Sequence, residues 1–167
     1  MSQAASGPGD RDPGLAALLD RQAIVDLLHE YCRCSDRNDC VGIAACFTDD
    51  CLADYGPGVG PPTRGSQARH DDAQAALKLF SATSHHLSNV VVTFDGPDAA
   101  VTSCNVYAWH RPVAPGPDWH LWAQYHDRVV RTDAGWRIAE RRMLVAGSDG
   151  FPPEWGWTPT DRLPSPS

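Results

Sequence analysis

Apolar residues follow a helical period in the first half of the chain. Between residues 21 and 35 they recur every three or four positions, which predicts an amphipathic helix with one buried stripe. The same spacing begins earlier, at Leu15, but Asp20 interrupts it, and we interpret this aspartate as the N-cap of the helix. A further helix is predicted over residues 71–80, where apolar residues are again three and four positions apart.

Between these two helices the pattern breaks into shorter pieces. Asp39 is placed to cap a short helix that continues through residue 47. Residues 51–55 form a predicted short strand, which the turn-forming sequence Gly56-Pro57-Gly58 ends. We expect a loop over residues 59–65.

The second half of the chain is rich in residues that favour strands. Four runs have this character, and turn-forming residues separate them. They cover residues 86–94, 99–109, 119–132 and 135–145. Helices followed by strands in hairpin order predict an α+β fold, in which the N-terminal helices pack on one face of a curved antiparallel sheet.

The two ends of the chain differ from this central part. Residues 1–14 mix Ser, Gly, Asp and Pro, and we expect a disordered arm before a domain over residues 15–147. Residues 148–167 form a proline-rich tail without a period. The tail either wraps over the domain through Trp155 and Trp157 or trails from it.

Composition and charge narrow the possible partners. The 167 residues carry 14 basic and 21 acidic side chains, a net charge of −7, so we expect no nucleic-acid partner. The hydrophobic fraction of 42% is ordinary, and no apolar run approaches the ~18 residues that span a bilayer, so we expect no membrane partner. The N-terminal residues lack the apolar stretch of a signal peptide, which predicts a cytoplasmic location.

Six cysteines raise the question of disulfides or a metal site. Five of them lie between residues 32 and 51 with no secretory signal, which favours reduced thiols. Cys32 and Cys34 are closer in sequence than the paired cysteines of zinc sites, and on a helix they point to nearly opposite sides. We interpret the cysteines as small buried residues and expect no metal and no other cofactor.

Alternation along the predicted strands sorts the candidate polar residues onto faces. His85 and Asn89 share one face of their strand, and Asn105 and Tyr107 share one face of the next. Tyr125 belongs to the third strand. The alternation does not identify which face is the inner one.

Four stretches of the chain resemble a known family. They are LLDRQAIVDLLHEYCRCSDRNDCVGIAACFTDD, ADYGPG, TSHHLSNVVVTFDGPDAAVTS and YHDRVVRTDAGWRIAERRM. Together they resemble the SnoaL-like branch of the nuclear transport factor two superfamily over roughly residues 15–145. The resemblance implies a cone-shaped α+β barrel, whose bent sheet and helices enclose one deep, mostly apolar pocket. The superfamily includes scytalone dehydratase, bile-acid dehydratase, a dehydrochlorinase, ketosteroid isomerase and polyketide cyclases, and also proteins that only bind.

The resemblance also implies a set of catalytic residues. Asp36, at the end of the long helix, matches the aspartate that pairs with a histidine in the dehydratases and dehydrochlorinases, and His85 matches that histidine. Tyr31 matches a position that is tyrosine in the bile-acid dehydratases. Arg141, five residues after Trp136, matches a pocket arginine.

Further residues are expected to bind the substrate. Tyr55 resembles a substrate-polarising tyrosine of scytalone dehydratase, and Asn105 falls where that enzyme has a second pocket histidine, which disfavours scytalone as substrate. Asn89, Tyr107 and Tyr125 complete the expected set. The remaining histidines show no ligand spacing; they are His29, His70, His110, His120 and His126.

The chemistry of such a set agrees with the resemblance. A carboxylate bonded to one imidazole nitrogen makes the other nitrogen a better base for a proton on carbon. A tyrosine or arginine then stabilises the enolate charge. These roles predict a lyase or isomerase, with a cyclase or an epimerase as alternatives, and the resemblance implies a hydrophobic polycyclic or polyketide-like substrate.

Non-catalytic interpretations of these residues stay open. Asp36 is also placed to cap a helix, and His85 to serve as a hydrogen-bonded structural group. Tyr31 is equally suited to core packing, and Arg141 to an ion pair with Glu140 or Asp127. A small-molecule binder or accessory protein of the same fold is then the alternative. In either case we expect a homo-oligomer, a trimer or dimer, because Trp122 and Val130 share one sheet face.

Overall fold

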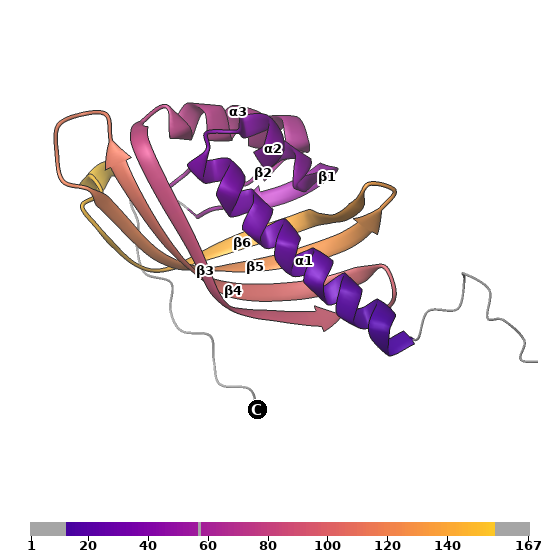
Figure 1. The fold of residues 1–167 in the computed structure, drawn as a ribbon. Helices are drawn as coiled ribbons and strands as arrows, with labels where there is room; N and C mark the ends of the chain where they lie inside the picture. Colours follow the sequence, from indigo (N-terminus) through magenta and orange to yellow (C-terminus); the bar gives the residue numbers. More distant parts are fainter. Residues whose placement is uncertain (1–12, 57, 156–167) are drawn as a thin grey trace, which may run out of the picture.

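Three helices lie on one side of a curved sheet of six strands (Figure 1). The computed structural model describes residues 13–56 and 58–155. The elements in chain order are α1 Pro13–Asp36, α2 Cys40–Ala45, β1 Phe47–Asp54, β2 Thr63–Arg64, α3 Ser66–Leu77, β3 Phe80–Phe94, β4 Ala99–Pro112, β5 Trp119–Thr132, β6 Gly135–Asp149 and the 3-10 turn η1 Pro153–Trp155. The predicted α+β class with N-terminal helices is confirmed.

The sheet is mixed rather than purely antiparallel, which corrects the expectation from the sequence. Its strand order is β2-β1-β6-β5-β4-β3, and β1 runs parallel to β6 while every other neighbouring pair is antiparallel. The hairpins that join β3 to β6 leave one edge of β6 unpaired. Strand β1, which follows α1 and α2 in the chain, pairs with this edge, so β6 lies in the interior of the sheet.

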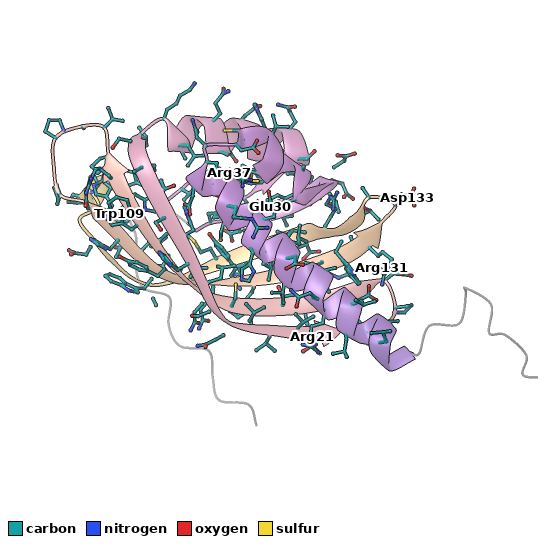
Figure 2. All side chains as sticks on the ribbon, viewed as in Figure 1. Arg21, Glu30, Arg37, Trp109, Arg131 and Asp133 are labelled. Atoms are coloured by element: carbon teal, nitrogen blue, oxygen red, sulfur yellow. The ribbon has the colours of Figure 1, made fainter. Side chains whose placement is uncertain are left out.

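Helix α1 is continuous from Pro13, so the prediction that Asp20 caps a shorter helix is wrong. A proline at the first helical position lacks only an N–H group that the helix would leave unpaired. Asp20 lies within the helix, where its carboxylate accepts hydrogen bonds from Arg131 Nη2 at 2.6 Å and Trp136 Nε1 at 3.2 Å. Figure 2 shows Arg131 at the end of β5 beside the N-terminal half of α1. The polar residue that interrupts the apolar stripe therefore tethers the helix to the sheet.

The shorter elements agree with the pattern, with shifted ends. Asp39 caps α2 as predicted, because its Oδ1 accepts a hydrogen bond from the backbone N–H of Gly42 at 2.8 Å. Strand β1 contains most of the predicted short strand, and the predicted loop over 59–65 contains the two-residue strand β2. Helix α3 begins five residues before the prediction and ends at Leu77, and Phe80 already belongs to β3.

The structure shows which face of the long strands is the inner one. In β5 the buried residues Leu121, Ala123 and Tyr125 face the helices, whereas Trp122 and Gln124 face outward. The core lies between this inner face and the apolar stripe of α1. A side chain at an inner position of β3, β4 or β5 therefore points towards the helices.

Regular structure continues beyond residue 147, the expected end of the domain. Strand β6 extends to Asp149, and Trp155 in η1 packs against Trp119 with ring centres 5.4 Å apart. The predictions for residues 1–12, for Trp157 and for the rest of the tail lie outside the described residues.

Candidate active site

A cavity of about 130 Å³ lies between the helices and the inner face of the sheet. Much of its wall is apolar, from residues such as Ala73, Leu77 and Leu121. A group of side chains that can ionise or donate hydrogen bonds interrupts this wall; they are Tyr31, Ser35, Tyr55, Arg69, Asp72, His85, His110 and Tyr125. The aromatic residues Phe151 and Trp155, after β6, line the same space.

Asp36 and His85 form a hydrogen-bonded pair at this cavity. Asp36 is the last residue of α1, and its Oδ1 lies 2.7 Å from Nδ1 of His85 in β3. The second oxygen, Oδ2, accepts the backbone N–H of His85 at 3.0 Å. The hydroxyl of Thr83 donates to Oδ1 at 3.0 Å. Because three donors hold the carboxylate, the orientation of the imidazole ring is fixed.

The ionisation of Asp36 fits the role of an orienting group. Burial raises the pKa of this carboxyl, but the hydrogen bonds from His85 and Thr83 outweigh burial and hold the pKa below its usual value. Asp36 is thus a carboxylate at neutral pH. Its bond to Nδ1 leaves Nε2 of His85 as the ring nitrogen available to act, and His85, with a side chain only 10% exposed, lines the cavity.

A second imidazole, His110, lies beside the first. It comes from an inner position of β4, and its ring meets that of His85 edge to face with centres 5.3 Å apart. Burial lowers the pKa of His110 to about 3, and the neighbouring His85 acts in the same direction, so His110 is neutral at physiological pH. Its Nδ1 has no hydrogen-bond partner among the described residues.

Tyr31 and Tyr55 meet through their hydroxyl groups, whose oxygens are 2.9 Å apart. Both rings contact Tyr125 edge to face, at 5.9 Å and 6.2 Å. Burial raises the pKa values of Tyr31 and Tyr125 well above the ordinary tyrosine value. These two phenols therefore stay neutral, as hydrogen-bond donors must.

Arg141 lies behind the tyrosines and is not part of the cavity wall. Its Nε and Nη2 donate to the two carboxylate oxygens of Asp127 at 2.9 Å and 2.7 Å, and both side chains are fully buried. The carbon Cζ of Arg141 is 4.2 Å from the ring centre of Tyr31 and 3.9 Å from that of Tyr125. Arg141 thus packs against the tyrosine rings from an ion pair that is buried rather than exposed.

Arg69 lines the cavity, although sequence reasoning missed it. It comes from α3, and its Cζ is 4.6 Å from the ring centre of Tyr55. Its Nη1 donates to Thr63 Oγ1 at 3.1 Å and to Asp72 Oδ2 at 2.8 Å. The available signal was helical spacing, because Arg69 is four residues before the apolar Ala73 and so shares its helix face.

The structure does not bring three of the expected substrate-binding residues to the cavity. Asn105 and Tyr107 occupy outer positions of β4, where Asn105 accepts a hydrogen bond from Gln124 at 3.1 Å. Asn89 is exposed, at an irregular point of β3 where its φ is +55°. A second histidine does line the cavity, but it is His110, which has the opposite parity to Asn105 in the same strand and therefore faces inward.

Comparison with known proteins identifies the family and the fold. A sequence model described as a SnoaL-like domain matches residues 16–142. The chain belongs to the SnoaL-like family. A search of curated proteins finds no match for this SnoaL-like chain.

Solved structures share its fold, that of nuclear transport factor two. A protein of Novosphingobium aromaticivorans DSM 12444, provisionally named scytalone dehydratase, is 28% identical, with a TM-score of 0.78 over 83% of this chain and 91% of that one. Another protein of that species, provisionally named an aromatic ring hydroxylase, is 24% identical, with a TM-score of 0.75 over 83% and 97%. The hexachlorocyclohexane dehydrochlorinase LinA type 2 is 20% identical, with a TM-score of 0.75 over 83% and 93%. The last two likenesses show the fold alone.

The described part of the SnoaL-like chain also bears on the expectations about a metal site, a membrane span and the cysteines. Within residues 13–56 and 58–155, no group of three or more His, Cys, Asp or Glu side chains is placed to hold a metal ion. In the same part of the chain, no helix has the length and apolar character needed to cross a membrane. The six cysteines are free thiols, and burial raises the pKa of Cys32 and Cys34 to about 12.

Proposed function

We propose that this SnoaL-like protein is a cofactor-independent lyase or isomerase that acts on a hydrophobic small molecule through Asp36 and His85. The observation that carries the proposal is the 2.7 Å contact between Asp36 Oδ1 and His85 Nδ1, made by a histidine that lines the cavity. The carboxylate stabilises the imidazolium that forms when Nε2 takes a proton, and it fixes the tautomer that leaves Nε2 unprotonated beforehand.

The reaction begins at a carbon next to a carbonyl group. The C–H bond breaks, its proton moves to His85 Nε2, and the electron pair passes to the carbonyl oxygen as an enolate. In an elimination the carbonyl re-forms, a C=C bond appears, and the C–O bond at the next carbon breaks. The departing hydroxide takes the proton from His85, so the products are an unsaturated carbonyl compound and water. If the proton returns to a different carbon instead, the net reaction is an isomerisation.

The other wall of the cavity suits the negative charge of the enolate. Tyr31 is neutral, and the pair that it forms with Tyr55 can donate a hydroxyl hydrogen bond to the enolate oxygen. In a site without water, such a hydrogen bond raises the rate by orders of magnitude. The relative of 28% identity that is provisionally named a dehydratase favours elimination among these outcomes. A cyclase or epimerase would begin with the same proton transfer.

The size of the cavity bears on the substrate. Ligand sites usually measure about 300–1,000 Å³, whereas this cavity measures about 130 Å³. An apolar cavity of about 150 Å³ holds one benzene ring. The site as it stands therefore encloses about one ring, and the polycyclic substrate expected from the family resemblance would extend beyond the enclosed volume.

Deuterium exchange tests the proton transfer without knowledge of the natural product. Single-ring ketones with a hydroxyl group two carbons from the carbonyl are incubated with the protein in D₂O, and NMR follows deuterium at the carbon between these groups. We expect His85→Ala to abolish exchange. Asp36→Asn should keep the fold but lower the rate steeply, because it removes the charge that supports the imidazolium.

A neighbouring histidine offers the matched control. His86 follows His85 in β3 but is exposed on the other face, so His86→Ala should leave the exchange rate unchanged. Tyr31→Phe should lower the rate by about ten- to a thousand-fold, because it removes a donor and leaves the base in place. Arg141→Ala should lower the rate by a similar factor and also lower the free energy of unfolding, because it leaves the buried Asp127 without its partner. Full exchange in both His85→Ala and Asp36→Asn would refute the dyad. Binding without exchange for every ketone would favour a non-catalytic binder.

A further inference from the structure

The tyrosine pair supplies fewer donors to the cavity than its two hydroxyl groups suggest. The oxygens of Tyr31 and Tyr55 are 2.9 Å apart, so one of the two hydroxyl protons is used in the bond between them. One proton remains for a ligand. An oxyanion is stabilised best by two or more donors, so the cavity needs another donor to complete such a site.

Arg69 has that donor. The residue is 95% buried and lines the cavity. Thr63 and Asp72 both accept from its Nη1, whereas its Nε is buried with no hydrogen-bond partner in the described part of the chain. A charged donor that is buried without an acceptor is more unfavourable than a neutral one, so an oxygen of a bound ligand would be a suitable acceptor for Nε.

The other buried arginine does not compete for this role. Arg141 also has one unpaired nitrogen, Nη1, but it does not line the cavity, and its charge is matched by a bidentate bond to the fully buried Asp127. Arg69 has only one nitrogen bonded to Asp72, whose side chain is 37% exposed. The charge of Arg69 is therefore the less completely neutralised of the two.

Arg69 is also held next to the tyrosine pair. Its guanidinium lies over the ring of Tyr55, with Cζ 4.6 Å from the ring centre, and Tyr55 bonds directly to Tyr31. The stacking and the two bonds of Nη1 limit the movement of the guanidinium. A ligand oxygen that accepts the free tyrosine proton is thus close to Arg69 as well.

We propose that Arg69 and the Tyr31–Tyr55 pair form an oxyanion-binding site, in which Arg69 Nε and one tyrosine hydroxyl both donate to the carbonyl oxygen of the substrate. This inference rests on the proposed function, and it narrows the substrate to a compact carbonyl compound of about one ring. Its oxygen becomes negative when His85 removes the proton. Arg69 is then a catalytic residue, whereas Arg141 holds the tyrosines in place.

A coloured phenol tests the site without turnover. 4-Nitrophenol has one ring and an ionisable oxygen, and 4-nitrotoluene has the same ring with a methyl group in place of that oxygen. Absorbance titration measures the affinity for the phenolate, and calorimetry measures the affinity for 4-nitrotoluene. The wild type should prefer the phenolate. Arg69→Met should weaken phenolate binding by about 10- to 100-fold and leave 4-nitrotoluene binding unchanged.

Three further variants make the result interpretable. Arg69→Lys keeps the charge but lacks Nε, and should restore part of the preference. Arg64→Met changes an exposed arginine of β2 and should have no effect. His85→Ala should keep the preference even though it abolishes deuterium exchange, so failure of the base and failure of the oxyanion site are separable.

Three outcomes would overturn the proposal. The first is a wild type that binds 4-nitrotoluene as well as the phenolate. The second is a wild type that binds neither compound. The third is a phenolate preference that survives in Arg69→Met. If Arg69→Met does not fold, the Arg69→Lys variant decides, and an undiminished preference there assigns the site to the tyrosines alone.

Discussion

His85 and His110 lie edge to face, but their surroundings differ. His85 has the carboxylate of Asp36 as a partner, whereas His110 packs against Phe80, with ring centres 4.6 Å apart, and Phe151, with ring centres 6.0 Å apart. The charge of Asp36 and a backbone hydrogen bond with Trp119 favour the imidazolium form of His110, but burial outweighs both and lowers its pKa. His110 therefore supplies a neutral donor or acceptor beside the proposed base, and protonating it works against the fold.

This burial makes the protein sensitive to mild acid. The folded-state pKa of His110, about 3, is below the unfolded value of about 6.5, so between these pH values the unfolded chain binds a proton that the folded chain does not. The free energy of unfolding should fall by up to about 1.4 kcal/mol per pH unit as the pH drops through this window. Urea unfolding at several pH values measures the slope.

The variant His110→Phe should flatten that slope, because phenylalanine has no proton to bind. His126→Gln, which changes a histidine of the outer face of β5, serves as the control and should keep the slope. An unaltered slope in His110→Phe would contradict the assignment. Asp36 adds a further loss of stability at lower pH. Its pKa is lower in the folded than in the unfolded chain, so its stabilisation is complete above the unfolded pKa and is lost as the pH falls through the folded pKa.

Part of the candidate site could be predicted from the sequence, and individual residues show why the rest could not. Asp36 and His85 were identified by family resemblance, and their contact is in the structure. Asn105 was misjudged because it was matched to the second pocket histidine of scytalone dehydratase, and strand alternation, which does not say which face is inner, could not show that His110 lies on the inner face instead. Arg69 was missed because an arginine on a short helix usually faces solvent, and only the tertiary packing shows that this one is buried.

Among the elements, the segment after β6 controls one side of the cavity. Gly150 has φ +78°, and a Cβ at this position would overlap the carbonyl oxygen of Asp118. The glycine lets the chain turn closely past the β4–β5 connection, and the turn brings Phe151 and Trp155 to the cavity wall.

The substitution Gly150→Ala should therefore displace this segment. We expect a loss of about 1–3 kcal/mol in the free energy of unfolding, together with weaker binding of 4-nitrotoluene. Gly96→Ala is the matched control, since Gly96 has φ +85° but open space around its Cα, so it shares the backbone strain without the overlap. Equal losses of ligand affinity in the two variants would show that the segment does not shape the cavity. Urea unfolding and calorimetry give the two quantities.

Periodicity predicted the elements better than it predicted their connections. The four long strands were recognised because each keeps its alternation over many residues. The continuity of α1 was not, because Asp20 reads as a cap unless its distant partners Arg131 and Trp136 are known. For the same reason no local pattern could show that β1 pairs with β6.

For the molecule as a whole, the outer face of the sheet has an aromatic group that the cavity does not use. Tyr107 lies between His86, with ring centres 5.8 Å apart, and Trp122, also at 5.8 Å, and His120 stacks on Trp122 at 6.0 Å. Trp122 is 45% exposed, and Val101 on the same face is 49% exposed. An apolar surface of this kind is costly to leave in water.

We predict that the protein forms a homo-oligomer, a dimer or trimer, through this outer face. Light scattering at micromolar concentration should give a multiple of 18.1 kDa. Trp122→Lys should shift the mass towards that of one chain, because it introduces a charge into the contact. Val41→Lys, at an exposed apolar residue of α2, should not. A monomeric wild type would refute the prediction.

The parallel pairing of β1 with β6 has a consequence for how the chain acquires its structure during synthesis. Phe47 lies opposite Ile138, so β1 cannot form its pairing with β6 until residue 138 and the rest of that strand have been synthesised. Contacts between such distant segments close a long loop of chain before they gain any packing energy, which slows folding. The edge of β1 that will pair with β6 therefore keeps its backbone N–H and C=O groups unpaired during most of the synthesis, and an unpaired strand edge is open to pairing with other chains.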